Sequence, residues 1–274
     1  MIFKNLLRRS FGLSLLAVCL GTPVAQAAAA APAAEAEVHL FLTRHGKTML
    51  NISDRVQGWS DAVLTPEGIA VAQDLGRGLK NTPFAAVYSS DSGRAMETAR
   101  VVQQFSGQTQ LPLQIDSRLR EFNFGSYEAD LNATLWGDAA RFDGMALEPW
   151  LKQFTPKRFA NTVAAMDRQR GTTHGKTWPA EDYATVSQRL IAALTDIASQ
   201  QARQGGGKVL VVSHGLAIAT VVDTLAPGNN YPLHKPLSNA SITEVVYRGG
   251  RFEVLTFNEM KYVKAGQEAA KVKP

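Results

Sequence analysis

Two His-Gly pairs, at His45 and His214, each come directly after a short apolar run, and the first is preceded by Arg44. A neutral imidazole can act as a nucleophile or a base, and a protonated one can donate hydrogen bonds to an anion. A guanidinium group presents a planar fork of donors that suits phosphate oxygens. A single histidine after a strand is more often a structural residue, so the case for chemistry depends on what accompanies it.

Two more charged residues occupy comparable places. Arg94 follows another apolar run, and Glu121 precedes a long region of different composition. Each has a structural alternative, because Arg94 could pair with Glu97 on one helix and Glu121 could be a surface acid beside Arg118 and Arg120. A purely structural explanation would need a separate coincidence at each of these residues. The residues taken together therefore favour a catalytic site.

Apolar runs alternate with segments of helical periodicity along the chain. The pattern predicts strands at 38–43, 85–89, 113–115, 208–213, 242–247 and 252–257. It predicts helices at 65–80, 92–105, 181–204 and 216–225. Thr65 followed by Pro66 is typical of a helix start, Pro112 favours an edge position for the strand after it, and residues 248–251 indicate a hairpin.

This alternation predicts an α/β fold with a mainly parallel central sheet and helices on both faces. Ligands of such sheets bind outside the carboxyl ends of the strands. Both His-Gly pairs fall at those ends, so the two histidines are expected to meet in one crevice. Residues 126–180, with helical fragments, three tryptophans and proline breaks, are predicted to be an insertion rather than a separate domain.

Five segments in a fixed order carry a resemblance to a known family. They are Leu42–Thr48 with Asn51, Val56–Gly68, Tyr88–Ala99, Leu119–Gly125 and Ser213–Gly215. In these segments the chain resembles the histidine phosphatase superfamily, in the larger branch that includes the cofactor-dependent phosphoglycerate mutases. The resemblance covers about residues 38–258 apart from the insertion, and it implies a phosphoglycerate mutase-like fold with a helical insertion over the active site.

The resemblance also implies the roles of the residues. The implied catalytic set is His45, Glu121, His214, Arg44 and Arg94. The implied substrate-binding set is Arg44, Asn51, Gln57, Gly58, Arg94, His214 and Gly215. In this scheme His45 accepts the phosphoryl group, while Glu121 protonates the leaving oxygen and then takes a proton from water. Asn51 also has a structural reading as a turn residue.

The chemistry sets conditions on two of these groups. His45 must be unprotonated to attack, so its ring needs a partner that fixes the tautomer, such as the Gly46 carbonyl or that of another loop residue. Nearby cations should disfavour its protonation. Glu121 should have a raised pKa, against the pull of the arginines, if it is to act as an acid.

The favoured function is an exported phosphomonoester hydrolase that works through a phosphohistidine. A phosphoglycerate mutase-like phosphotransferase and a catalytically inactive phosphoester-binding protein remain alternatives. A mutase must bind a second acidic group of its substrate. Residues 130–180 hold five acidic and seven basic side chains, and this small excess of positive charge gives the mutase alternative little support. The expected partner is a small phosphoester, while the sequence leaves its identity and the oligomeric state open.

The N-terminus predicts a secretory signal at residues 1–27. Its basic residues are Lys4, Arg8 and Arg9, its apolar stretch is 11–20, and Ala25-Gln26-Ala27 offers a cleavage site. A membrane anchor or a buried helix is the alternative. A periplasmic or secreted location is therefore expected, with no stable membrane span once the signal is removed.

The composition argues against thiol chemistry and nucleic-acid binding. The single cysteine, Cys19, lies in the predicted signal, so the mature chain would have no thiol chemistry. Of 29 basic residues three lie in the signal, leaving 26 against 24 acidic residues, which gives no reason to expect nucleic acid as a partner. No histidine and carboxylate spacing predicts a metal site, and no cofactor is expected.

Three segments are expected after the predicted signal. Residues 28–37 are expected to be a flexible lead-in, 38–260 the domain, and 261–274 a loose C-terminal tail.

Two residues depart from the pattern of the family. Lys47 stands where the family more often has an acidic or amide residue, and its side chain is either simply solvated or adds attraction for an anionic substrate. Ala129 replaces a frequent glycine, which puts the shape of the loop after Glu121 in question.

Overall fold

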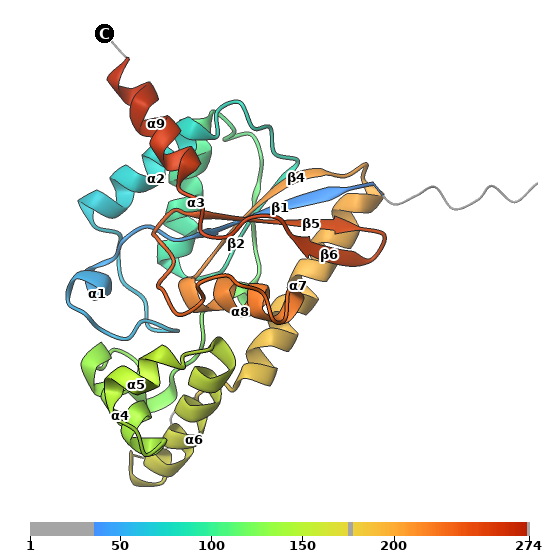
Figure 1. The fold of residues 1–274 in the computed structure, drawn as a ribbon. Helices are drawn as coiled ribbons and strands as arrows, with labels where there is room; N and C mark the ends of the chain where they lie inside the picture. Colours follow the sequence, from blue (N-terminus) through green and yellow to red (C-terminus); the bar gives the residue numbers. More distant parts are fainter. Residues whose placement is uncertain (1–35, 175–177, 273–274) are drawn as a thin grey trace, which may run out of the picture. The chain divides into compact units, whose positions relative to one another are not determined.

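The computed structural model describes residues 36–174 and 178–272 of the chain (Figure 1). Within them six strands form one sheet in the order β3-β2-β4-β1-β5-β6. Their bounds are β1 (Val38–Arg44), β2 (Ala86–Ser89), β3 (Leu113–Ile115), β4 (Gly207–Ser213), β5 (Ile242–Arg248) and β6 (Arg251–Val254). The predicted signal, 1–27, and most of the predicted lead-in lie outside the described residues.

The sheet is mainly parallel, as predicted. Strands β3, β2, β4 and β1 run parallel to one another, and β5 and β6 add an antiparallel hairpin beyond β1. The short β3 lies at the edge, directly after Pro112, whose missing N–H an edge tolerates. Strand β6 ends at Val254, three residues before its predicted end.

Helices cover both faces of the sheet, and the residues of β1 show why. Side chains alternate along a strand, so Leu40 and Leu42 join one buried cluster while Phe41 joins the other. The cluster around Phe41 includes residues of α2 (Pro66–Gly78) and α3 (Gly93–Ser106), and the cluster around Leu40 includes residues of α7 (Tyr183–Arg203) and α8 (Gly215–Leu225). The predicted start of α2 is confirmed, because Thr65 Oγ1 accepts from Gly68 N at 3.1 Å.

The insertion is helical and shares a core with the sheet. Its main helices are α4 (Asn132–Phe142), α5 (Leu147–Lys152) and α6 (Pro156–His174) (Figure 1). Trp150 and Phe159 are buried and belong to the same apolar cluster as Leu40. The insertion is therefore part of one domain. Shorter turns are α1 (Met49–Ile52), η1 (Ser117–Leu119) and η2 (Gly125–Tyr127).

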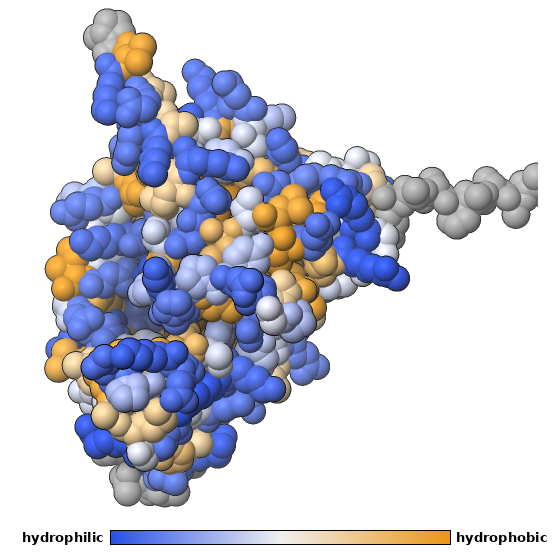
Figure 2. All heavy atoms as spheres, viewed as in Figure 1, coloured by the Kyte–Doolittle hydropathy of each residue, from blue (hydrophilic) through white to orange (hydrophobic). Residues whose placement is uncertain are grey.

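The prediction of a loose tail over 261–274 is wrong for its described part. Residues Lys261–Lys271 form helix α9, which packs on α2, and hydrophilic residues cover most of it in Figure 2. A Cβ on Gly266 would overlap the Asp74 carbonyl oxygen, so the glycine lets the two backbones approach closely. The helix is mostly polar and only Val263 and Gly266 are buried, so no apolar run marks it in the sequence.

No helix among residues 36–174 and 178–272 has the length and apolar character needed to cross a bilayer.

Ala129 adopts a left-handed backbone, with φ of 63°. This conformation costs an L-residue with a Cβ about 1–2 kcal/mol, which is why a glycine would suit the position. In this conformation Ala129 N donates to the Val56 carbonyl at 3.1 Å.

Replacing Ala129 by glycine is therefore expected to stabilise the protein by about 0.5–1 kcal/mol, the relief of strain exceeding the added freedom of the unfolded chain. Chemical denaturation measures this free energy. Ala192→Gly, at an exposed position inside α7, is the matched control and should destabilise by about 1 kcal/mol. Equal destabilisation by both changes would show that Ala129 carries no strain.

Candidate active site

Two parallel strands place the two histidines side by side. Arg44 on β1 pairs in register with Ser213 on β4, and His45 N donates to the Ser213 carbonyl at 3.1 Å. The imidazole rings of His45 and His214 consequently lie with centroids 5.3 Å apart. The prediction that both His-Gly pairs meet at the carboxyl ends of the strands is confirmed.

The His45 ring is buried and its tautomer is fixed. Its Nδ1 lies 2.7 Å from the Gly46 carbonyl oxygen, one of the partners expected from the sequence. A carbonyl only accepts, so Nδ1 carries the proton and Nε2 keeps its lone pair. Burial, with Arg94 and then Arg44 nearby, holds the pKa of His45 well below its usual value. The low pKa and the fixed tautomer leave the Nε2 lone pair free, as a nucleophile would require.

Arg94 is almost fully buried and held from several sides. Its Nη1 donates to the Ser60 carbonyl and to Asp61 Oδ1, both at 3.0 Å, and its Nη2 donates to the Gly58 carbonyl at 2.7 Å. Nη2 also lies 3.0 Å from His214 Nδ1. Asp61 thus balances part of the charge, while the carbonyls fix the plane of the guanidinium group.

Three buried nitrogens of the site have no protein partner. Arg44 donates from Nη1 to the Leu237 carbonyl, but its Nε has no hydrogen-bond partner, and neither do Arg94 Nε and Gln57 Nε2. All three carry hydrogen and can only donate. Unpaired buried donors are costly, and a ligand with several acceptor oxygens would satisfy them.

His214 is fully buried and neutral in this structure. Burial, followed by the charge of Arg94, holds its pKa well below the usual value. Because Arg94 donates to Nδ1, the proton lies on Nε2, which donates to Ser90 Oγ at 2.8 Å. An arginine and a dry environment both disfavour a second positive charge here, so His214 could donate to an anion from both nitrogens only after gaining a proton.

Glu121 lies at the N-terminus of α8. Its Oε2 accepts from Leu216 N at 2.9 Å, and its Oε1 accepts from Ala217 N and Phe122 N at 2.8 and 3.0 Å. These N–H groups favour the carboxylate, but burial outweighs them and raises the pKa of Glu121. A raised pKa is what we expected from the sequence for Glu121 if it is to act as an acid.

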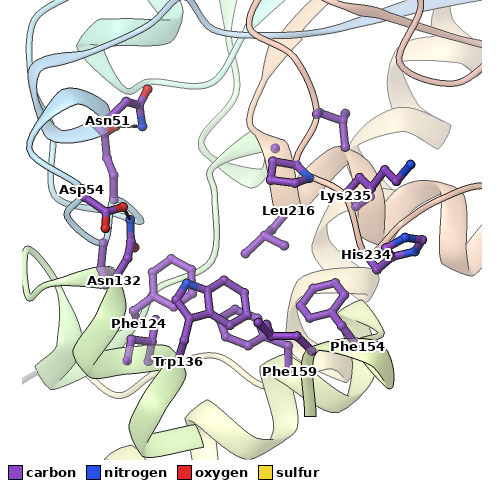
Figure 3. A pocket seen from close by; sticks show the side chains of 18 of the residues that line it. Asn51, Asp54, Phe124, Asn132, Trp136, Phe154, Phe159, Leu216, His234 and Lys235 are labelled. Carbon is purple, nitrogen blue, oxygen red and sulfur yellow. Dashed lines mark hydrogen bonds between the residues drawn. The ribbon is translucent and has the colours of Figure 1, made fainter. Parts of the chain in front are cut away.

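A cavity of about 790 Å³ opens above these groups (Figure 3). Six of the predicted site residues line it, namely Arg44, His45, Asn51, Gln57, Glu121 and Gly215. Arg94, His214 and Gly58 are not among its lining residues. Asn51 lies in the short helix α1, where its Oδ1 also accepts from Thr48 N in a capping box. Lys47 does not line the cavity.

Several positioning residues were not predicted. Glu128 accepts from the backbone N–H groups of Gly58, Trp59 and Ser60, and also from Ser60 Oγ and Phe124 N. Arg189 donates to the carbonyls of Glu121, Arg120 and Arg118. Such contacts join distant backbone segments, so no local pattern encodes them.

Glu128→Gln is expected to lower kcat/KM by about 10- to 100-fold, because an amide nitrogen would face a backbone donor and loosen the two carbonyls that hold Arg94. Weaker competitive inhibition by inorganic phosphate should accompany the loss, which a purely structural role would not produce at temperatures far below unfolding. Glu268→Gln, in an exposed pair with Lys271, is the control and should leave both quantities unchanged.

Comparisons with known proteins agree with this architecture. The family model described as "Histidine phosphatase superfamily (branch 1)" matches residues 40–148 and 141–260. "Probable phosphoglycerate mutase GpmB" of Yersinia pestis is 30% identical over 215 residues, which are 77% of this chain and 86% of that protein. The chain therefore belongs to the histidine phosphatase superfamily, branch 1.

Solved structures similar to this chain include a phosphoglycerate mutase and a phosphatase. A phosphoglycerate mutase from Bacillus anthracis is 37% identical with a TM-score of 0.78, over 85% of this chain and 98% of the other. Bacillus stearothermophilus YhfR is 29% identical with a TM-score of 0.61, over 82% and 99%. A mycobacterial glucosyl-3-phosphoglycerate phosphatase, at 23% identity, a TM-score of 0.59 and coverage of 81% and 99%, shares the fold.

Proposed function

We propose that this protein is a phosphomonoester hydrolase that acts through a phosphohistidine at His45. The observation that carries the proposal is the set of buried donors without a protein partner, at Arg44, Arg94 and Gln57, around a neutral histidine. A phosphoryl group has oxygens on several sides and spreads negative charge over them in the transition state. The donors and the nucleophile together suit that group.

In the first step the Nε2 lone pair of His45 attacks phosphorus and the bond to the ester oxygen breaks. Glu121 gives its proton to that departing oxygen, which leaves as the alcohol. Arg44 and Arg94 stabilise the charge on the other phosphoryl oxygens without reorganising, because the protein already fixes them. The entering phosphoryl charge also makes protonation of His214 easier.

In the second step the Glu121 carboxylate takes a proton from water. The water oxygen attacks phosphorus, the bond to His45 Nε2 breaks, and inorganic phosphate leaves. The backbone N–H groups of Leu216 and Phe122 stabilise the carboxylate between the two steps. Splitting one displacement into two easier ones is the advantage of the covalent intermediate.

Phosphoglycerate mutase activity is the second candidate, favoured by the 37% identity with the Bacillus anthracis enzyme. Its product would be an isomeric phosphoglycerate, whereas hydrolysis releases inorganic phosphate. Incubation with phosphoglycerate, followed by separation of the isomers and measurement of free phosphate, distinguishes the two. Isomerisation faster than phosphate release would overturn the proposed hydrolysis.

The proposed function is tested with an aryl phosphate in the presence of a chelator, because the proposed steps use only side chains of the chain. Turnover that persists, with a phosphorylated histidine trapped on rapid quenching, supports it. Binding of phosphate without any turnover would instead support a binding protein.

Export is a separate part of the proposal and rests on the pattern of residues 1–27. N-terminal sequencing of the mature protein tests it, with cleavage after Ala27 or within the following alanines as the expected result.

A further inference from the structure

Beyond the phosphoryl-binding groups, one wall of the cavity is aromatic. Phe124, Trp136, Phe154 and Phe159 lie along one side of it in Figure 3. Trp136 stacks on Phe159 with ring centroids 4.4 Å apart and planes 19° from parallel, and Phe159 also contacts Phe124 and Phe154. The rings hold one another in place, so this apolar wall is formed before any ligand binds.

The opposite wall is also apolar near the reacting groups. It includes Leu216 and Ala219 of α8, with Leu233 and Leu237 from the loop that follows. Leu216 is joined to the chemistry directly, because its N–H holds the Glu121 carboxylate. The oxygen that Glu121 protonates is the one bonded to the alcohol, so the alcohol part of the ester enters between these two walls.

The positively charged residues of the cavity are poorly placed to bind an alcohol that carries a carboxylate. Apart from Arg44, the arginines and lysines that line it in the described chain are Arg55, Lys152 and Lys235, and all three are exposed. Lys152 also pairs with Glu148 at 2.8 Å. A carboxylate placed between the apolar walls would lose hydration without gaining a buried partner, which is costly.

We propose that the substrate is a phosphomonoester of an apolar alcohol, aliphatic or aromatic, whose hydrocarbon part occupies the space between these two walls. The inference rests on the proposed function for its chemistry, and it names the substrate class of that same site. The volume of about 790 Å³ is in the range of cavities that enclose small-molecule ligands.

A series of linear alkyl phosphates from ethyl to octyl tests the proposal. The reactivity of the alcohols changes little along the series, so kcat/KM reports the binding of the chain. We expect kcat/KM to rise about twofold for each methylene, roughly half the effect of complete burial. A flat series, or a preference for phosphoglycerate over hexyl phosphate, would overturn the proposal.

Two leucines allow a matched comparison of variants. Leu147 and Leu151 of α5 line the cavity and are each 41% exposed, so glutamine at either position should fold. Leu147→Gln and Leu151→Gln should lower kcat/KM for octyl phosphate about three- to tenfold and leave ethyl phosphate unchanged. Leu255→Gln, on a leucine 38% exposed that does not line the cavity, should change neither.

Binding of alkyl phosphonates separates the two proposals, because it needs no turnover. Octyl phosphonate should bind on the order of 100-fold more tightly than methyl phosphonate, measured by calorimetry. Tighter binding of octyl phosphonate without hydrolysis of any ester would contradict the proposed function but support the apolar site. Hydrolysis with equal affinity for the two phosphonates would defeat the apolar site and keep the function.

Discussion

Replacement of His45 by alanine is expected to lower kcat/KM by about 10⁴-fold or more, and to abolish labelling of the protein by a phosphorylated substrate. The loss of both together follows from the structure, because the Gly46 carbonyl fixes the proton on Nδ1 and leaves Nε2 as the attacking atom. Rapid quenching with radiolabelled substrate measures the intermediate, which should be labile in acid.

A histidine of strand β1 serves as the control. His39 lies near the start of β1, roughly 17 Å from Arg44 along the strand, where it pairs with Glu37 and Glu244. His39→Ala should keep full labelling and turnover. Labelling that survives in His45→Ala would place the covalent step on another residue and contradict the proposed mechanism.

Glu121→Gln is expected to slow esters with poor leaving groups by about 10²- to 10⁴-fold. The amide cannot supply the proton that an alkoxide leaving group requires, whereas a nitrophenolate leaves without it. An aryl phosphate with a good leaving group should therefore slow far less, by about tenfold. The ratio of the two effects, measured as kcat/KM, is the decisive quantity, because a folding defect would slow both equally.

The pH dependence gives an independent measure of the same group. Burial raises the pKa of Glu121 above its ordinary value of 4.5, and the first step needs the protonated form. The rate with a poor leaving group should fall as pH rises through that raised pKa, and Glu121→Gln should remove this limb. Glu244→Gln, at a partly buried carboxylate paired with His39, should keep it.

Much of the site could be predicted because its residues are close to strand ends in the sequence. His45 and His214 each follow a run of buried residues, and parallel strands bring their carboxyl ends to one edge of the sheet. Arg94 likewise opens the helix after β2. The order of the motifs then identified the family, and the family model and the relatives confirmed it.

Other features depended on contacts that no local pattern encodes. The lowered pKa of His214 follows from complete burial beside Arg94, which the sequence alone does not show. Helix α9 was missed because only Val263 and Gly266 are buried, and Gly266 matters through its fit to the Asp74 backbone.

By itself the sequence determined the fold class and the family, and it predicted the five residues of the proposed phosphoryl site, since each rests on a short pattern of residue types. Only the tertiary structure decided how those residues are supported and what surrounds them. Glu128 reaches the 58–60 backbone across the chain, and the rings at Phe124 and Phe159 meet only when the insertion packs. Burial and long-range packing set charge and cavity shape, and both arise from the folded chain as a whole.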